Sequence, residues 1–191
     1  MTYNTLFMFV QLLMTICSGW SANSNPLLSS PIGPYRVVFK QVYICNPKQN
    51  NKIQHYLYLS HKANSTWIFG NTTLEIPLDD TFFLEMSMSV KDSFGNWKEN
   101  VFMHKVSKAC SSFKKLMGNT WKLFLHGNGI QNTECPILPG VYKSPGFDLS
   151  LFDKSNFPKS FFYGTYKFRM FYSKSNEIFG CQVYIIELKR P

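Results

Sequence analysis

Cysteine is the residue that most constrains this fold. A cysteine forms a disulfide, binds a metal or acts as a nucleophile, depending on the cellular compartment in which the chain folds. The 191-residue chain has five cysteines. Cys17 lies in an apolar N-terminal stretch, and Cys45, Cys110, Cys135 and Cys181 are spread over the remainder. Neither a Cys-x-x-Cys pair nor a histidine at ligand spacing accompanies them, so zinc is not indicated. In an exported chain, the four later cysteines predict two disulfides with three possible connectivities.

The N-terminus predicts export. The run LFMFVQLLMTIC, from Leu6 to Cys17, is apolar and too short for a comfortable membrane-spanning helix, and small residues follow it. We expect residues 1–21 to be a secretory signal peptide cleaved after Gly19 or Ser21, with an uncleaved signal anchor as the alternative. Cleavage would remove Cys17 and leave a secreted, extracellular protein.

Two sequons agree with export. Asn64-Ser65-Thr66 and Asn71-Thr72-Thr73 both have the acceptor pattern for N-glycosylation. We therefore predict Asn64 and Asn71 as glycosylation sites, in a region that would then face solvent.

The charge and the aromatic content limit the kind of partner. The formal net charge is +9, but lysine and arginine stand singly among tyrosine and phenylalanine rather than in blocks. This pattern does not predict nucleic-acid binding, and in an exported protein it favours anionic lipid surfaces, acidic glycans or simple solubility. Aromatic residues make up 17% of the chain, more than a small core usually needs.

After an irregular leader at 22–34, residues 35–191 predict one mainly β domain. Apolar and polar residues alternate as in strands. The clearest pair is a hairpin of 82–90 and 97–106 around the turn DSFGN. In the first strand, one face is expected to carry Tyr35, Val37, Phe39, Gln41 and Tyr43 together with Cys45. Further strands are expected at 55–60, 66–69, 72–76, 141–142, 146–152, 165–173 and 178–188.

One segment has helical spacing instead. Apolar residues recur there at intervals of three and four, at Phe113, Leu116, Met117, Trp121 and Phe124. Ser111 or Ser112 could cap this helix, and Gly127 could end it. Gly118 weakens its middle, so we expect a short or broken helix. Together the patterns predict antiparallel β structure with one short helical insert, arranged as a sandwich or a flattened barrel.

The C-terminal third carries a set of paired motifs. They are Cys135-Pro136, Gly140-Val141-Tyr142, Pro158, Gly164-Thr165-Tyr166 and Gly180-Cys181. This arrangement resembles the MD-2-related lipid-recognition superfamily, in particular its ganglioside GM2-activator-like branch, and within that branch it looks most like the insect chemosensory protein B family. The likeness is motif-specific from Cys135 to Leu188 and only topological from Tyr35 to Lys108.

The resemblance implies a fold and a disulfide connectivity. The fold would be an immunoglobulin-like β-sandwich, or cup, and the bridges would be Cys45–Cys181 and Cys110–Cys135. The strand pattern agrees, because the first and last strands both place their cysteine on the face expected to be apolar. Both cysteines are then expected to point into one interior.

A lipid-recognition cup would also use the aromatic excess, because residues that line a ligand cavity pack against ligand rather than against each other. Methionine suits such irregular contacts. The expected lining residues are Trp67, Phe69, Phe82, Leu84, Met86, Met88, Phe102, Phe168, Met170 and Tyr172. The helical insert would add a lid or rim of Phe113, Leu116, Trp121 and Phe124. Its polar face, with Lys114, Lys115 and Lys122, could meet anionic head groups or simply face solvent.

No catalytic motif is present. The sequence has no Gly-x-Ser-x-Gly, no His-Glu-x-x-His and no phosphate loop, and the four histidines lack the neighbours of a secreted nuclease. We expect no enzyme, no cofactor and no metal. The leading hypothesis is a secreted carrier of a lipid, sterol or hydrocarbon pheromone in chemosensory detection. The alternatives are an extracellular co-receptor that acts through its surface, and a degraded hydrolase-like enzyme.

Overall fold

A computed structural model describes residues 31–62 and 65–191 of the chain. The predicted signal peptide, Cys17 and Asn64 lie outside these residues, as does most of the predicted leader. Within 31–62 and 65–191, no helix is long and apolar enough to cross a bilayer.

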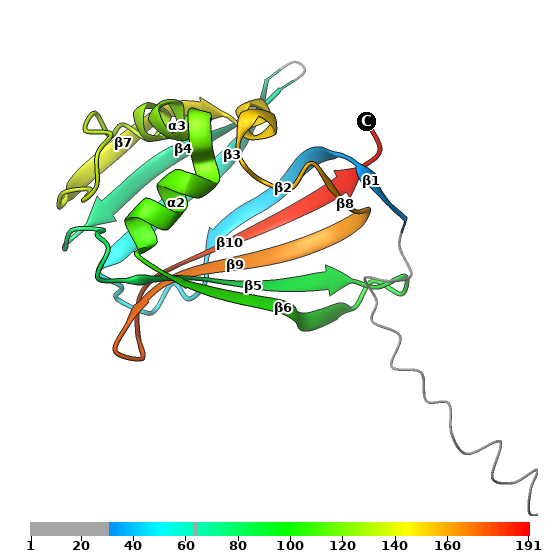
Figure 1. Ribbon diagram of the computed structural model, residues 1–191, viewed down its shortest axis with the longest axis horizontal. Coiled ribbons are helices and arrows are strands. Elements are labelled where there is room, and N and C mark those ends of the chain that lie inside the picture. The colour runs from blue at the N-terminus through cyan, green and yellow to red at the C-terminus, as the bar shows by residue number, and fades with distance from the viewer. Residues whose placement is uncertain (1–30, 63–64) are drawn as a thin grey trace, which may run out of the picture.

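Antiparallel strands form two facing sheets, which confirms the predicted mainly β sandwich (Figure 1). The larger sheet has the order β2-β10-β9-β5-β6, and the smaller has the order β3-β4-β7. The five-stranded sheet consists of β2 (Arg36–Ile44), β10 (Glu177–Lys189), β9 (Gly164–Lys174), β5 (Phe83–Lys91) and β6 (Trp97–Ser107). The three-stranded sheet consists of β3 (Ile53–Lys62), β4 (Ser65–Leu74) and β7 (Gly140–Asp148). β1 (Ile32–Pro34) and β8 (Ser160–Phe162) pair with each other as a separate two-stranded ribbon, and Phe161 of β8 packs against the five-stranded sheet.

Some strand boundaries differ from the sequence prediction. The strands expected at 66–69 and 72–76 are one continuous strand, β4. Gly70 allows this continuity, because its φ is 136° and a Cβ at this position would lie only 2.0 Å from the Tyr56 carbonyl oxygen. The strand expected at 146–152 ends at Asp148, whose carboxylate accepts from the Ser150 amide and begins the short 3-10 helix η2 (Leu149–Lys154). The end of the leader, expected to be irregular, forms β1.

The two disulfides have the connectivity that the resemblance implies. The Cα atoms of Cys45 and Cys181 are 5.5 Å apart, and those of Cys110 and Cys135 are 6.0 Å apart. The first bridge links β10 to the residue that follows β2, and the second links the start of the helical insert to the loop before β7. Each bridge therefore closes a long stretch of chain, which limits the freedom of the unfolded state.

The expected direction of Cys45 and Cys181 was wrong. Successive side chains of a strand point to opposite faces, and Gln182 faces the interior between the sheets, so Cys181 lies on the outer face of the five-stranded sheet. Cys45 lies on that outer face too, because the register of β2 against β10 shifts at Lys40. Such a bulge exchanges the two faces of a strand. Phe39 is buried, whereas Gln41 and Tyr43 are exposed.

The helical insert is broken, as the sequence predicts. Helix α2 (Ala109–Met117) ends at Gly118, the turn η1 (Gly118–Thr120) follows, and α3 (Trp121–Gly127) continues after it. In Figure 1, α3 lies against the three-stranded sheet and α2 runs from there toward β5 of the five-stranded sheet. The predicted serine cap was wrong, because Ser111 and Ser112 lie inside the first turn of α2.

An aspartate in a preceding loop caps α2 instead. The Ser111 amide and hydroxyl donate to the two carboxylate oxygens of Asp80 at 2.8 and 2.6 Å. Burial alone would raise the pKa of Asp80, but these hydrogen bonds and the charge of Lys108 hold it below its ordinary value. The carboxylate also opposes the positive end of the helix dipole.

We therefore expect Asp80→Asn to lower the free energy of unfolding by about 1 kcal/mol, since it removes a capping charge. The loss should be seen in urea unfolding at neutral pH. It should shrink as acid protonates Asp80 in the wild type, because a group with a depressed folded-state pKa stabilises only above that pKa. The exposed Asp153→Asn is the control, and equal effects of the two variants would contradict the cap.

Candidate functional site

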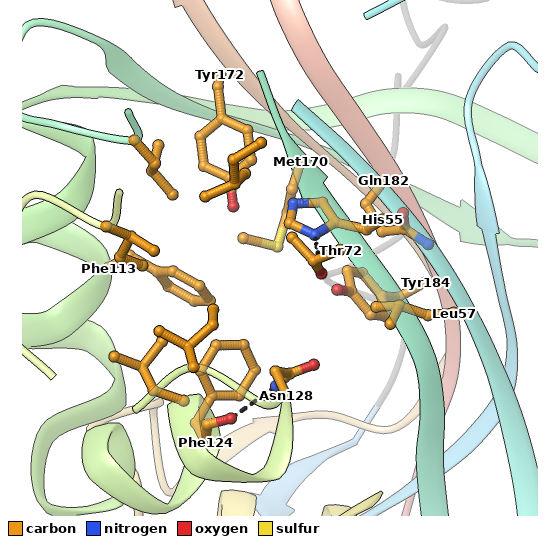
Figure 2. A pocket seen from close by; sticks show the side chains of 15 residues that line it. His55, Leu57, Thr72, Phe113, Phe124, Asn128, Met170, Tyr172, Gln182 and Tyr184 are labelled. Atoms are coloured by element: carbon orange, nitrogen blue, oxygen red, sulfur yellow. Dashed lines mark hydrogen bonds between the residues drawn. The ribbon is translucent and has the colours of Figure 1, made fainter. Parts of the chain in front are cut away.

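A cavity of about 40 Å³ lies between the two sheets, beneath the helical insert (Figure 2). On this scale one water molecule needs about 10–15 Å³. Strands β3, β4, β9 and β10 all contribute side chains to it, and so do α2 and α3. The apolar lining residues are Leu57, Leu74, Leu78, Phe113, Phe124, Leu125, Ile130, Ile137 and Met170, and the polar ones are His55, Thr72, Asn128, Tyr172, Gln182 and Tyr184.

The structure brings some of the predicted lining residues together at this cavity. Phe113 and Phe124 reach it from the helices, and Met170 and Tyr172 reach it from β9. Their rings and thioether converge from opposite layers in Figure 2. These residues share the cavity because helix and strand periodicity both turn them inward.

Other predicted lining residues lie elsewhere. Phe82, Leu84 and Trp121 are buried in the main core and do not line the cavity. Met88 is buried in a second cluster under the β1–β8 ribbon, and Phe168 packs against that cluster. Met86 and Leu116 are half-buried, and Phe102 is 45% exposed on the edge strand β6.

Trp67 and Phe69 lie on the outer face of the three-stranded sheet rather than in the interior. They alternate along β4 with Ile68, which is buried. Phe69 stacks on Tyr58 of β3, with ring centroids 6.0 Å apart, and the Lys62 ammonium lies 4.9 Å from the Phe69 ring centroid. We call Tyr56, Tyr58, Trp67 and Phe69 the outer aromatic face. The predicted glycosylation site Asn71 pairs with Tyr56 across the same two strands.

The aromatic side chains of the insert close the cavity on the helical side. The Phe113 and Phe124 rings meet edge-to-face at 5.3 Å, and Phe124 meets Phe147 of β7 in the same way at 5.5 Å. The Trp121 indole nitrogen donates to the Thr133 carbonyl at 2.7 Å. The insert is thus packed through rings, which can change rotamer without losing backbone hydrogen bonds.

The polar lining residues were missed by sequence reasoning, which searched only for apolar side chains. His55 Nδ1 lies 2.9 Å from the Thr72 hydroxyl, and its ring centroid lies 5.9 Å from that of Tyr172. Strand alternation could have identified two of these polar residues, because Gln182 and Tyr184 lie on the same face of β10 as the buried Gly180.

Burial sets the ionisation of this cluster. It lowers the pKa of His55 to about 4, so the imidazole is neutral at physiological pH. Burial likewise raises the pKa of Tyr172 and of Tyr184 far above the ordinary tyrosine value, with Tyr184 adding to the effect on Tyr172. The cavity therefore presents neutral donors and acceptors.

A second hollow, of about 350 Å³, lies on the surface beside the β9–β10 turn. Phe82 and Phe179 line it with their rings edge-to-face at 5.2 Å, and the Lys174 ammonium lies 5.6 Å from the Phe82 ring centroid. It is wider than the internal cavity but open to solvent.

The lysines of the insert are divided in their contacts. Lys114 forms an ion pair with Glu134 at 2.6 Å, whereas Lys115 and Lys122 are exposed.

Across the part of the chain that the structure describes, no group of three or more histidine, cysteine, aspartate or glutamate side chains could hold a metal ion. No protein-family model matches the chain, and no curated protein matches it either.

The buried His55 makes stability depend on pH. Its pKa is about 4 in the folded state and near 6.5 when the chain is unfolded, so the unfolded state binds the proton first as pH falls. Stability should be complete above pH 6.5 and should decline toward pH 4, by roughly 3 kcal/mol in all.

Urea unfolding of the wild type and His55→Gln at pH 7 and pH 4.5 would measure this effect, with the ring protons of His55 followed by NMR. The variant should lose the pH-dependent component. His61→Gln, at the exposed end of the same strand, is the matched control. An unchanged pH dependence in His55→Gln would contradict the assignment.

Proposed function

We propose that this protein is a secreted carrier of a hydrophobic ligand, such as a lipid, a sterol or a hydrocarbon pheromone, acting in chemosensory detection. The observation that carries the proposal is the internal cavity, whose walls come from both sheets and from the helical insert. The motif resemblance to the MD-2-related lipid-recognition superfamily, and within it to the insect chemosensory protein B family, supports the same assignment.

Uptake of a ligand requires the cup to open. Pockets for drug-sized ligands usually measure about 300–1,000 Å³, far above the 40 Å³ between the sheets. Phe113 and Phe124 are the residues whose displacement would enlarge the cavity, because their rings form its helical wall. In this proposal α2 and α3 are the lid, and their lost ring contacts are replaced by contacts with the ligand.

The first measurement is native mass spectrometry of the oxidised protein from a eukaryotic secretion host, followed by solvent extraction. We expect a bound mass that extracts as lipid or hydrocarbon. An unliganded mass, together with no uptake of a fluorescent fatty acid or hydrocarbon probe, would contradict the carrier function.

Two methionines on opposite sides of one sheet give a matched pair of variants. Met170 lines the cavity, whereas Met103 is 66% exposed on the outer face of β6. We expect Met170→Glu to weaken probe binding at least about tenfold, because an unpaired charge would be buried at the ligand. Met103→Glu should bind as the wild type does. If folded Met170→Glu bound the probe as tightly as the wild type does, the cavity would not be the ligand-binding site.

The outer aromatic face favours a second candidate, an extracellular interaction protein. Tyr56 is 48% exposed and Tyr58 is 59% exposed, and exposed aromatic residues of this kind are frequent at protein interfaces. If this candidate is right, Tyr58→Ser with Phe69→Ser should abolish the protein's effect in a chemosensory response assay, while Met170→Glu should retain it. The opposite pattern would favour the carrier.

A further inference from the structure

The interior of the cup holds buried polar atoms that have no hydrogen-bond partner among the described residues. They are His55 Nε2 and both side-chain amide atoms of Gln182. Gln182 is only 3% exposed, so bulk water does not satisfy it. A buried polar group without a partner costs about 1–3 kcal/mol, and natural proteins leave few of them.

These unpartnered atoms belong to side chains that face one place. Gln182 and Tyr184 lie on the same face of β10, and Gln182 pairs with Met170 of β9. His55 comes from β3 in the opposite sheet. His55, Gln182 and Tyr184 all line the internal cavity, and Figure 2 shows His55 and Tyr184 across from Phe113 and Phe124. The rings of Phe113 and Phe124 make the helical wall of the cavity mainly apolar, whereas the strand wall carries polar side chains beside Leu57, Leu74 and Met170.

We propose that the strand wall, through His55 and Gln182, is a hydrogen-bonding site for the single hydroxyl group of an otherwise apolar ligand, such as a long-chain alcohol. This inference rests on the proposed carrier function and names the ligand class. A hydroxyl both donates and accepts, and the Gln182 amide offers both a donor and an acceptor. The Tyr172 and Tyr184 hydroxyls line the same cavity.

The charges of the site exclude an ionised ligand. None of the side chains that line the cavity is lysine, arginine, aspartate or glutamate, and the buried His55 is neutral at physiological pH. A carboxylate would be buried there without a cation, which is costly. A pure hydrocarbon would leave Gln182 unpartnered. A neutral hydroxyl avoids both penalties.

The experiment compares three probes of equal chain length, 1-hexadecanol, hexadecane and palmitate, binding to the oxidised full-length secreted protein at pH 7. We expect hexadecanol to bind at least about tenfold more tightly than either of the others. The variants Gln182→Met and His55→Phe, which keep bulk but lose the polar atoms, should bring the alcohol-to-alkane ratio close to one.

Gln41→Met is the matched control, since Gln41 is an exposed glutamine on the outer face of the same sheet. A second readout is stability: Gln182→Met should raise the urea midpoint, because it removes an unpartnered buried amide. A wild type that binds alcohol and alkane equally, or a Gln182→Met protein that keeps the preference, would overturn the hydroxyl site alone. Binding of none of the three probes would overturn the carrier function with it.

Discussion

The alternation of side chains along β10 is the constraint on which the rest of the structure depends. This strand lies between β2 and β9 in the five-stranded sheet, so it fixes the register of both neighbours. Cys181 and Gln182 are adjacent in it, and a strand sends adjacent side chains to opposite faces. The disulfide therefore lies outside the sandwich and leaves the interior free for Gln182 and Tyr184. A register slip of one residue would exchange the two sets.

The helical insert is anchored unevenly, and this affects how the cup could open. Helix α2 is held at its first turn by Asp80 and by the Cys110–Cys135 bridge. Gly118, at φ 55°, then interrupts the helix, and α3 is held mainly by its contacts with β7. Phe124 lies beyond the break and Phe113 lies before it. In the proposed opening we therefore expect α3, which lies beyond the break, to move more than α2.

The sequence predicted correctly those features that depend on neighbouring residues alone. The hairpin of β5 and β6 follows from strict alternation around a polar turn, and the broken insert follows from apolar spacing interrupted at Gly118. The disulfide pairing came from a motif resemblance. The faces of Gln41, Tyr43 and Cys45 were wrong because the bulge at Lys40 arises from pairing with β10, which β2 alone does not reveal. The cavity was predictable only in part: Met170 and Phe124 follow from periodicity, whereas Trp67 and Phe69 show equally apolar alternation and face outward.

Polar residues in the interior trade stability for recognition. An all-apolar cup would be more stable, because each unpartnered buried polar atom weakens the folded state. In the proposed carrier function, the same atoms would give the bound ligand its orientation, since apolar contacts alone hold a chain in no fixed register. His55 illustrates the trade, because one ring nitrogen is satisfied by Thr72 within the protein and the other is left for the cavity. If the protein carries a hydrophobic ligand as we propose, the small volume between the sheets and the unpartnered polar atoms have one cause, because the bound ligand would both enlarge the cavity and pair with those atoms.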